Sequence, residues 1–174
     1  MFSDDILLFL QQKKLNSMEE LTLKSKIQVC QLEELTAAEQ QLIDLAIKQT
    51  DHSYAPHSHF HVGAALMLES GRLIAGCNQE NAVLPAGICA ERSAIFSAGA
   101  QYPSDAVTTI AVAARDTKGE LTEEPVSPCG ICRQVIVETE TRFHRQIRIL
   151  LYGQKHIYAV EGLGQLLPLT FSEF

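Results

Sequence analysis

No stretch of this 174-residue chain is suited to crossing a membrane, because no apolar run approaches the roughly 20 residues that a spanning helix needs. The beginning also lacks the pattern of a secretory signal. The segment "DDILLFLQQKK" places acidic residues before a short apolar run, and no small-residue cleavage site follows it. We therefore expect a cytoplasmic protein with no membrane partner.

Basic charge is scarce. Fourteen Lys and Arg residues stand against 21 Asp and Glu residues, which gives a net charge of −7, and the densest cationic segment is only "FHRQIR". Affinity for nucleic acid comes mainly from clustered cations that neutralise phosphates. The composition therefore argues against a nucleic-acid partner and favours a small, neutral or weakly polar substrate.

Cysteine is odd in number. The five cysteines are Cys30, Cys77, Cys89, Cys129 and Cys132. An odd count without an export signal disfavours a disulfide framework, and reduced thiols remain available for a metal or for nucleophilic chemistry. We expect Cys30 and Cys77 to be small buried hydrophobes.

The spacing of apolar residues predicts an alternation of strands and helices. Strands are expected over residues 22–29, 61–69, 72–78, 106–115, 147–152 and 156–160. Helices are expected after a capping box formed by Thr36 and Glu39, over residues 89–99, and over residues 129–139. The order β-α-β-β-α-β-α-β-β is typical of a layered α/β domain with helices on a mixed sheet.

Two of these helices carry specific expectations about buried side chains. The apolar positions of the first helix are Leu42, Ile43, Ala46 and Ile47. Those of the last helix are Ile131, Val135 and Ile136. The first 17 residues fit a short amphipathic helix or a loose extension, and Met18 is a candidate start of the functional part. We expect residues 1–20 to be an N-terminal extension and residues 21–174 to form a single domain.

Three cysteines stand at predicted helix starts. Cys89 lies in "AGICAERSAIF", and Cys129 and Cys132 lie in "SPCGICRQV" about forty residues later. Helix N-termini stabilise thiolates, and Zn²⁺ prefers sulfur ligands in tetrahedral geometry. Three ligands without an evident fourth leave one position open, which is typical of a catalytic zinc that lowers the pKa of a bound water.

Charged residues next to Cys89 fit the same site. Glu91 is close enough to move a proton between the water and a substrate nitrogen without binding the metal. Arg92, with Arg133 as a second candidate, can hydrogen-bond the sulfurs and draw off their negative charge. Taken one at a time, the Cys-x-x-Cys pair also fits a redox pair or a structural zinc site, Glu91 a helix-dipole residue, and Arg92 a solvated surface residue.

The conjunction of Cys-Ala-Glu with a later Pro-Cys-x-x-Cys matches the pattern of zinc deaminases of nucleosides and bases. Five segments carry the fuller resemblance, over about residues 20–172: "YAPHSHFHVGAAL", "GRLIAGCNQENA", "ICAERSAIF", "SPCGICRQV" and "LLPLTF". On these segments the chain resembles the cytidine deaminase family, in its homotetrameric three-cysteine branch. The resemblance implies a three-layer α-β-α fold with a mixed, roughly five-stranded sheet and a homotetramer with one Zn²⁺ per subunit.

The same resemblance implies the reaction and the metal site. The activity would be hydrolysis of cytidine and deoxycytidine to uridine and deoxyuridine plus ammonia, in pyrimidine salvage. Cys89, Cys129 and Cys132 would hold the zinc, Glu91 would be the general acid and base, and Arg92 would support the sulfurs.

Five further positions would contact the substrate. Asn78 and Glu80 would hydrogen-bond the ribose hydroxyls. Phe60 would pack on the pyrimidine ring, and the backbone N–H of Ala90 would face the carbonyl oxygen of the base. Phe171 would reach the site of a neighbouring subunit.

Two departures from the family pattern lie near this expected site. Leu84 stands where the family often has an aromatic residue, and His61 stands where it usually has proline, so both can alter the rim. His57, His59 and His61 alternate in "HSHFH" and could form a second metal site; loop histidines near a substrate entrance are the simpler interpretation.

Three rival functions remain open. One is deamination of another aminated heterocycle, such as a nucleoside antibiotic that contains cytosine. A second is a zinc-stapled scaffold without catalysis, which needs a fourth protein ligand. A third is a polynucleotide deaminase, which the net charge disfavours.

Overall fold

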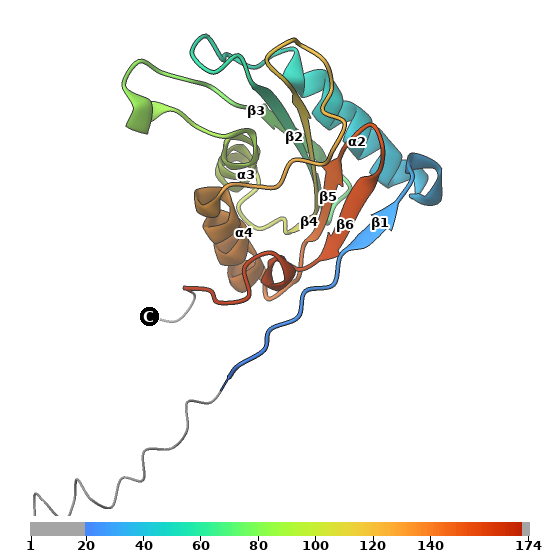
Figure 1. The fold of residues 1–174 in the computed structure, drawn as a ribbon. Helices are drawn as coiled ribbons and strands as arrows, with labels where there is room; N and C mark the ends of the chain where they lie inside the picture. Colours follow the sequence, from blue (N-terminus) through green and yellow to red (C-terminus); the bar gives the residue numbers. More distant parts are fainter. Residues whose placement is uncertain (1–19, 172–174) are drawn as a thin grey trace, which may run out of the picture.

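The computed structural model describes residues 20–171 and contains one mixed sheet. Its six strands lie in the order β1-β6-β5-β4-β2-β3 (Figure 1). Their bounds are β1 Gln28–Cys30, β2 His61–Leu68, β3 Leu73–Cys77, β4 Val107–Arg115, β5 Arg148–Tyr152 and β6 Ile157–Glu161. β4 and β5 are parallel, and the other neighbouring pairs are antiparallel.

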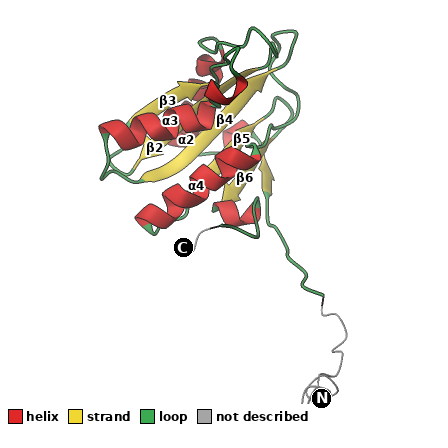
Figure 2. Cartoon of the chain, turned by 90° about the vertical axis from the view of Figure 1, so that its left-hand side faces the viewer, coloured by secondary structure: helices red, strands yellow, loops and turns green. Residues whose placement is uncertain are grey.

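Helices cover both faces of the sheet. α2 (Ala37–Thr50) lies on one face, and α3 (Ala90–Gln101) and α4 (Gly130–Phe143) lie on the other (Figures 1 and 2). Two buried clusters correspond to these faces: one includes Leu42 of α2, and the other includes Ala94 of α3 and Ile136 of α4. The predicted three-layer α-β-α fold is confirmed, with six strands in place of about five.

The first helix follows the sequence expectation closely. Thr36 Oγ1 accepts a hydrogen bond from the Glu39 backbone N–H at 3.3 Å, and Glu39 Oε2 accepts one from the Thr36 N–H at 2.9 Å, which forms the predicted capping box. Three of the four expected apolar positions are buried, namely Leu42, Ile43 and Ala46, and Ile47 is partly buried.

The first strand and the last helix differ from the prediction. Of the expected strand 22–29, only Gln28 and Val29 pair with β6, together with Cys30, and the preceding residues extend away from the domain (Figure 1). The reason is that β6 ends at Glu161 and the chain turns at Gly162, so residues 22–25 have no neighbouring strand. Ile131 was expected to be a core position of α4, but its side chain is 62% exposed, because Ile136 and not Ile131 faces the sheet.

Two glycines allow the helices to approach the sheet closely. A Cβ at Gly63 of β2 would lie 2.0 Å from the Ala46 carbonyl oxygen of α2. A Cβ at Gly76 of β3 would lie 2.5 Å from the Ala94 nitrogen and 2.8 Å from the Ala90 carbonyl oxygen of α3. Gly76 therefore sets how closely the first turns of α3 approach β3.

Two further expectations concern the N-terminal segment and membrane-spanning helices. The predicted N-terminal helix and the candidate start at Met18 lie outside the described residues. No helix within residues 20–171 combines the length and apolarity needed to cross a membrane.

Candidate metal centre

Three cysteine sulfurs meet where α3 and α4 begin. Cys89 is the N-cap residue of α3, Cys129 is the N-cap residue of α4, and Cys132 lies in the first turn of α4. The Sγ atoms of Cys89 and Cys129 are 3.8 Å apart, and those of Cys129 and Cys132 are 3.5 Å apart. Neither N-cap cysteine makes a side-chain capping bond among the described residues, so both sulfurs remain available for a ligand.

The spacing of the sulfurs fits zinc. Zinc–sulfur bonds of about 2.3 Å at tetrahedral angles separate the sulfurs by about 3.8 Å, close to the two measured distances. All three sulfurs lie within 4.8 Å of one another, and no other group of three potential ligands occurs within residues 20–171. Cys89, Cys129 and Cys132 would therefore hold Zn²⁺ through three sulfurs and leave one coordination position for another ligand.

Negative charge in this cluster is concentrated on Cys89. A hydrogen bond from Cys132 lowers the pKa of Cys89 to about 5, against the effect of burial, with further bonds from Arg92 and Cys129. The Cys89 thiolate and burial together raise the pKa of Cys132. Without a cation, one thiolate therefore disfavours the next, and a divalent metal ion would compensate for this repulsion.

Glu91 is a buried carboxyl group beside the sulfurs. Its residue is 4% exposed in the first turn of α3. Burial raises the pKa of Glu91, and the negative charge of Cys89 acts in the same direction. A carboxyl group whose pKa is raised toward neutrality can both accept and donate a proton, which suits a general acid and base.

The two arginines near the sulfurs have different roles. Arg92 Nη2 lies 3.7 Å from Cys89 Sγ, as expected for a residue that supports the thiolate. Arg133 was expected as a second such residue, but its guanidinium hydrogen-bonds the Pro128 and Leu166 carbonyl oxygens and the Ser127 hydroxyl. It therefore holds the segment before Cys129 against the C-terminal segment and does not contact the sulfurs.

A cavity of about 530 Å³ opens beside Cys89. This volume is within the range of small-molecule sites. Its lining includes Asn78 and Glu80 after β3, and Cys89 and Arg92 at the start of α3. Four of the residues predicted from the sequence for the site therefore meet around one cavity.

The polar side chains after β3 hold the opposite wall of this cavity. Asn78 Nδ2 donates to the Phe60 carbonyl oxygen at 2.9 Å, and Asn78 Oδ1 accepts from the Val62 N–H at 2.8 Å. Glu80 Oε2 accepts from the backbone N–H groups of His57 and Ser58, at 2.8 and 3.2 Å. Hydrogen bonds from Ser58 and His57 lower the pKa of Glu80, so this carboxylate remains charged.

Three other expected substrate contacts lie outside the lining of this cavity. Phe60 is partly buried beside Asn78, and Ala90 is fully buried as the first residue of α3. The Phe171 carbonyl oxygen accepts a hydrogen bond from Gln134 of α4 at 2.7 Å, and the Phe171 side chain is 69% exposed. Within one chain, Phe171 does not reach the cavity.

The histidine-rich segment does not form a second metal site. His57 lines the cavity, as expected for a residue near a substrate entrance, and His61 hydrogen-bonds Ser53. His59 has a positive φ of 54°, which breaks the alternation that the pattern assumed. Leu84 also lines the cavity, as expected for a rim residue.

Cavity residues that the sequence did not reveal include Ser58, Gln79 and Ile88. Gln79 forms isolated β-bridges with Tyr54 and with Ile88, which bring the loops that carry these three residues together. No local sequence pattern predicts such a pairing. Cys30 and Cys77, which were expected to be buried, are only partly buried. Cys77 Sγ accepts a hydrogen bond from Gln79 Nε2 at 3.2 Å.

Comparisons with known proteins agree with this site. Residues 36–145 match the model of the "Cytidine and deoxycytidylate deaminase zinc-binding region". A cytidine deaminase of Sporosarcina psychrophila is 46% identical over 137 residues, which are 77% of this chain and 91% of that protein. A blasticidin-S deaminase of Bacillus cereus is 30% identical over 134 residues, which are 76% of this chain and 86% of that protein.

A solved structure of a related protein has the same fold. The crystal structure of cytidine deaminase from Burkholderia pseudomallei superposes with a TM-score of 0.65 at 36% identity, and covers 79% of this chain and all of that chain. The cysteine cluster and Glu91 lie within the matched residues 36–145. The chain therefore belongs to the cytidine and deoxycytidylate deaminase family of zinc enzymes.

Proposed function

We propose that this protein hydrolyses cytidine and deoxycytidine to uridine and deoxyuridine with release of ammonia, as a step of pyrimidine salvage. The observation that carries the proposal is the position of buried Glu91 beside a three-sulfur cluster whose Cys89 lines a cavity of nucleoside size. The family and its relatives support the choice of a cytosine nucleoside.

The chemistry divides between the metal and Glu91. When bound, Zn²⁺ acts as a Lewis acid that makes water a nucleophile near neutral pH. Glu91 takes a proton from the attacking water and delivers it to N3 of the cytosine ring while the oxygen adds to C4. It then moves the proton of the hydroxyl added at C4 to the amino group; the C4–N bond breaks, the C4 oxygen becomes a carbonyl, and ammonia leaves. The raised pKa of Glu91 suits both directions of transfer.

The remaining expected contacts orient the nucleoside. Asn78 and Glu80 line the cavity and offer amide and carboxylate groups to the ribose hydroxyls. Phe60 would pack on the pyrimidine ring. The Ala90 N–H belongs to the first turn of α3, where backbone donors lack partners within the helix, and it would bind the carbonyl oxygen of the base.

Self-association as a homotetramer is part of this proposal. Phe96 of α3 is 52% exposed and Ile131 of α4 is 62% exposed, on the helices that begin at the cysteines. Phe171 is exposed near α4, where it could enter a site of a second copy. Light scattering of the purified protein should give four times the mass of one chain, and a monomer would contradict this part.

A reducing compartment suits the metal site. The three sulfurs bind zinc as thiolates, so oxidation would destroy the site. The cytoplasm keeps thiols reduced, and we therefore propose it as the location of the enzyme. We also propose that residues 1–20 are an N-terminal extension and that residues 21–174 form the single catalytic domain.

The decisive test is an absorbance assay on cytidine with the purified protein, before and after treatment with a zinc chelator. Activity that disappears with the metal and returns with added Zn²⁺ would support the proposal. Full activity in a protein without metal would overturn it.

A second candidate function is deamination of a cytosine-containing nucleoside antibiotic. The similarity to a blasticidin-S deaminase favours it, as does Leu84 at the rim of the cavity. The ratio of kcat/KM for cytidine, deoxycytidine and blasticidin S decides between the two candidates.

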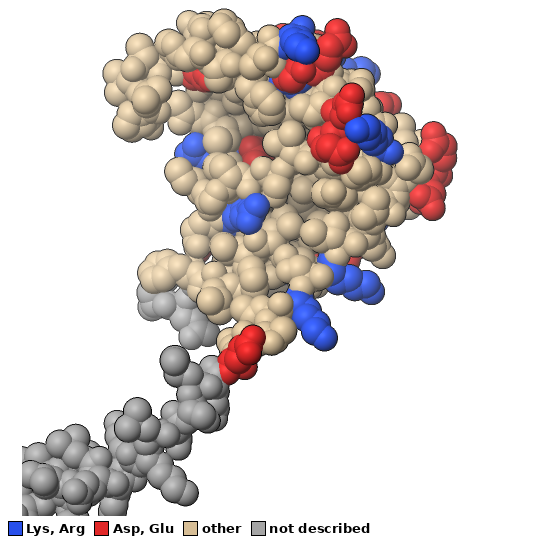
Figure 3. Space-filling view, viewed as in Figure 1, with Lys and Arg blue, Asp and Glu red and all other residues tan. Residues whose placement is uncertain are grey.

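The scaffold and polynucleotide functions find less support. No fourth potential ligand joins the three cysteines within residues 20–171. Among the described residues on the face drawn in Figure 3, lysine and arginine side chains are scattered and form no continuous basic stripe. Salt-sensitive binding of single-stranded RNA would revive the polynucleotide function.

A further inference from the structure

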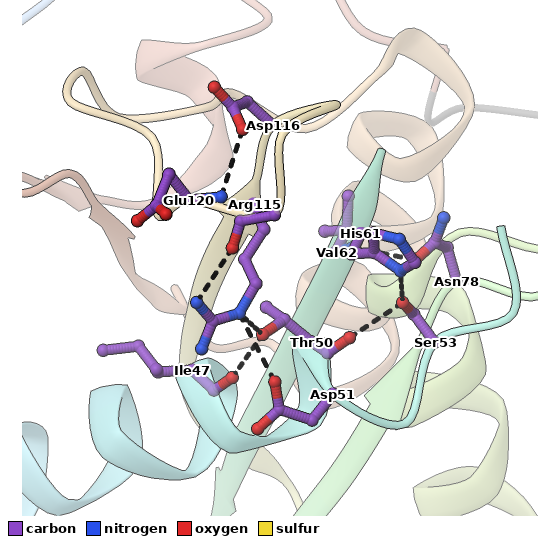
Figure 4. Close-up of polar contacts among 11 residues, drawn as sticks. Ile47, Thr50, Asp51, Ser53, His61, Val62, Asn78, Arg115, Asp116 and Glu120 are labelled. Carbon is purple, nitrogen blue, oxygen red and sulfur yellow. Dashed lines mark hydrogen bonds and ion pairs between the residues drawn. The ribbon is translucent and has the colours of Figure 1, made fainter. Parts of the chain in front are cut away.

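The loop between α2 and β2 forms part of the cavity wall, and its two ends are joined by one hydrogen bond. We call residues 54–60 the rim loop; it contributes His57 and Ser58 to the lining. Ser53 precedes this loop and His61 follows it. Ser53 Oγ and His61 Nδ1 are 2.5 Å apart, and both side chains are drawn in Figure 4.

His61 faces away from the α3 side of the sheet. Along β2, Ala64 packs in the cluster with α3 and α4, and Ala65 packs in the cluster with α2. Because side chains alternate along a strand, His61 shares the face of Ala65 and points toward α2, where Ser53 lies. The His61 ring therefore lies on the α2 side of the sheet, where it can support the ends of the rim loop. It would not contact a ligand in the cavity.

The Ser53 hydroxyl has two hydrogen-bond partners, because Ser53 Oγ also lies 2.8 Å from the Thr50 carbonyl oxygen, which can only accept. When the hydroxyl proton points at the Thr50 oxygen, His61 Nδ1–H donates to Ser53 Oγ; when it points at His61, Nδ1 accepts. Either arrangement joins Ser53 to His61. Thr50 is itself held, because its hydroxyl donates to the Ile47 carbonyl oxygen at 2.6 Å and accepts from Arg115 Nε at 2.8 Å (Figure 4).

Asn78 connects the Ser53–His61 contact to the cavity. Its amide group hydrogen-bonds the Phe60 carbonyl oxygen and the Val62 N–H, the backbone groups on either side of His61. The Tyr54 N–H also donates to the Asn78 carbonyl oxygen at 3.0 Å, so both ends of the rim loop meet Asn78. A shift of His61 would therefore displace a side chain that lines the cavity.

We propose that Ser53 and His61 are positioning residues: their hydrogen bond closes the base of the rim loop and so sets the affinity of the cavity for its ligand. The inference rests on the proposed function only in taking that ligand to be a nucleoside. The pair lies outside the catalytic machinery, because neither side chain lines the cavity or contacts the sulfurs.

The test uses Ser53→Ala, His61→Leu and the double variant in the zinc-loaded enzyme. Loss of one partly buried hydrogen bond should raise KM for cytidine about fivefold, with kcat within about twofold of the parent value. The double variant should be no worse than Ser53→Ala alone, because Ser53→Ala already lacks the bond to His61. His61→Asn should keep KM near the parent value, since the Asn amide carries both a donor and an acceptor on Cγ, the atom to which Nδ1 of His is bonded. Ser104→Ala, at an exposed serine after α3, is the matched control.

A second readout does not depend on catalysis. Hydrogen exchange at the backbone N–H groups of Tyr54, His57 and Ser58 should quicken in Ser53→Ala and remain at the parent rate in Ser104→Ala. Unchanged exchange would overturn the proposed closure of the loop. Faster exchange with an unchanged KM would overturn its link to affinity. A parent protein inactive on cytidine would overturn the proposed function, and the exchange experiment would still decide the role of the pair.

Discussion

The cavity has one wall at the start of α3, which we call the metal wall together with the sulfur cluster that Cys89 belongs to, and another built by loops, the rim wall; the two are stabilised differently. At the metal wall, Cys89 and Cys129 are N-cap residues, so each sulfur is placed by the local geometry of its own helix. At the rim wall, Asn78 and Glu80 hold backbone groups of a loop about 20 positions away in sequence. Substitutions at the metal wall should therefore abolish the reaction, and those at the rim wall should weaken binding.

The largest effect should come from removing a sulfur. Cys129→Ala leaves two sulfurs, too few for a tetrahedral zinc site with one open position, so we expect loss of the metal, lower stability and activity below detection. Zinc content per chain, measured by atomic emission, checks this. Cys77→Ala removes a partly buried thiol outside the cluster and should keep both zinc and activity. Full metal content in Cys129→Ala would refute the ligand assignment.

Next in size should be the loss of Glu91, the proposed proton carrier. Glu91→Gln keeps the shape of the side chain but cannot transfer a proton, so kcat should fall by roughly 10²-fold or more while zinc remains bound. Single-turnover rates and zinc content are the measurements. Glu124→Gln, at an exposed carboxylate, is the matched control. A variant that loses its metal would contradict the separation of proton transfer from ligation.

The close packing of α3 against β3 can be disrupted without changing a functional side chain. The Cβ introduced by Gly76→Ala would clash with the Ala94 nitrogen and the Ala90 carbonyl oxygen, so the start of α3 must move. We expect a loss of about 1–3 kcal/mol in the free energy of unfolding, together with a lower kcat, because Cys89 and Glu91 move with this helix. Gly164→Ala has open space around the new Cβ and should behave like the parent.

The same contrast explains what the sequence could predict. Cys89, Glu91 and Cys132 were identifiable because a helix start and a short motif place them. The capping box of Thr36 and Glu39 was identifiable for the same reason. Local geometry decides all of these positions.

The sequence could not predict features that depend on distant partners. Residues 22–25 of the expected first strand have no partner because β6 ends at Glu161. Arg133 donates a hydrogen bond to a carbonyl oxygen 33 residues later in the chain, and no motif predicts this contact. Ser58 joins the cavity through Glu80, 22 residues away. Such contacts follow from tertiary packing, which local spacing does not encode.

At the rim wall, Glu80→Gln should have a smaller effect than the metal-wall variants. Glutamine keeps one acceptor oxygen but loses the charge that strengthens the bonds from His57 and Ser58. We expect KM for cytidine to rise about tenfold with a nearly unchanged kcat, as for an interaction made equally in the ground and transition states. Gln79→Glu, at the adjacent cavity position, is a control for altered charge. A drop in kcat with unchanged KM would place Glu80 in the chemical step.

The smallest effect on catalysis should come from a variant that touches neither wall. Thr36→Ala removes the N-cap of α2 and should cost about 1 kcal/mol of unfolding free energy at pH 7, with kcat/KM unchanged. Burial raises the pKa of Glu39, but hydrogen bonds from Thr36 and Arg148 outweigh it and lower the pKa overall. A lowered folded-state pKa stabilises the protein above the unfolded pKa, and that contribution is lost as pH falls through the folded value. The deficit of Thr36→Ala in urea denaturation should therefore shrink in acid, and a deficit that grows there would contradict the ionised capping box.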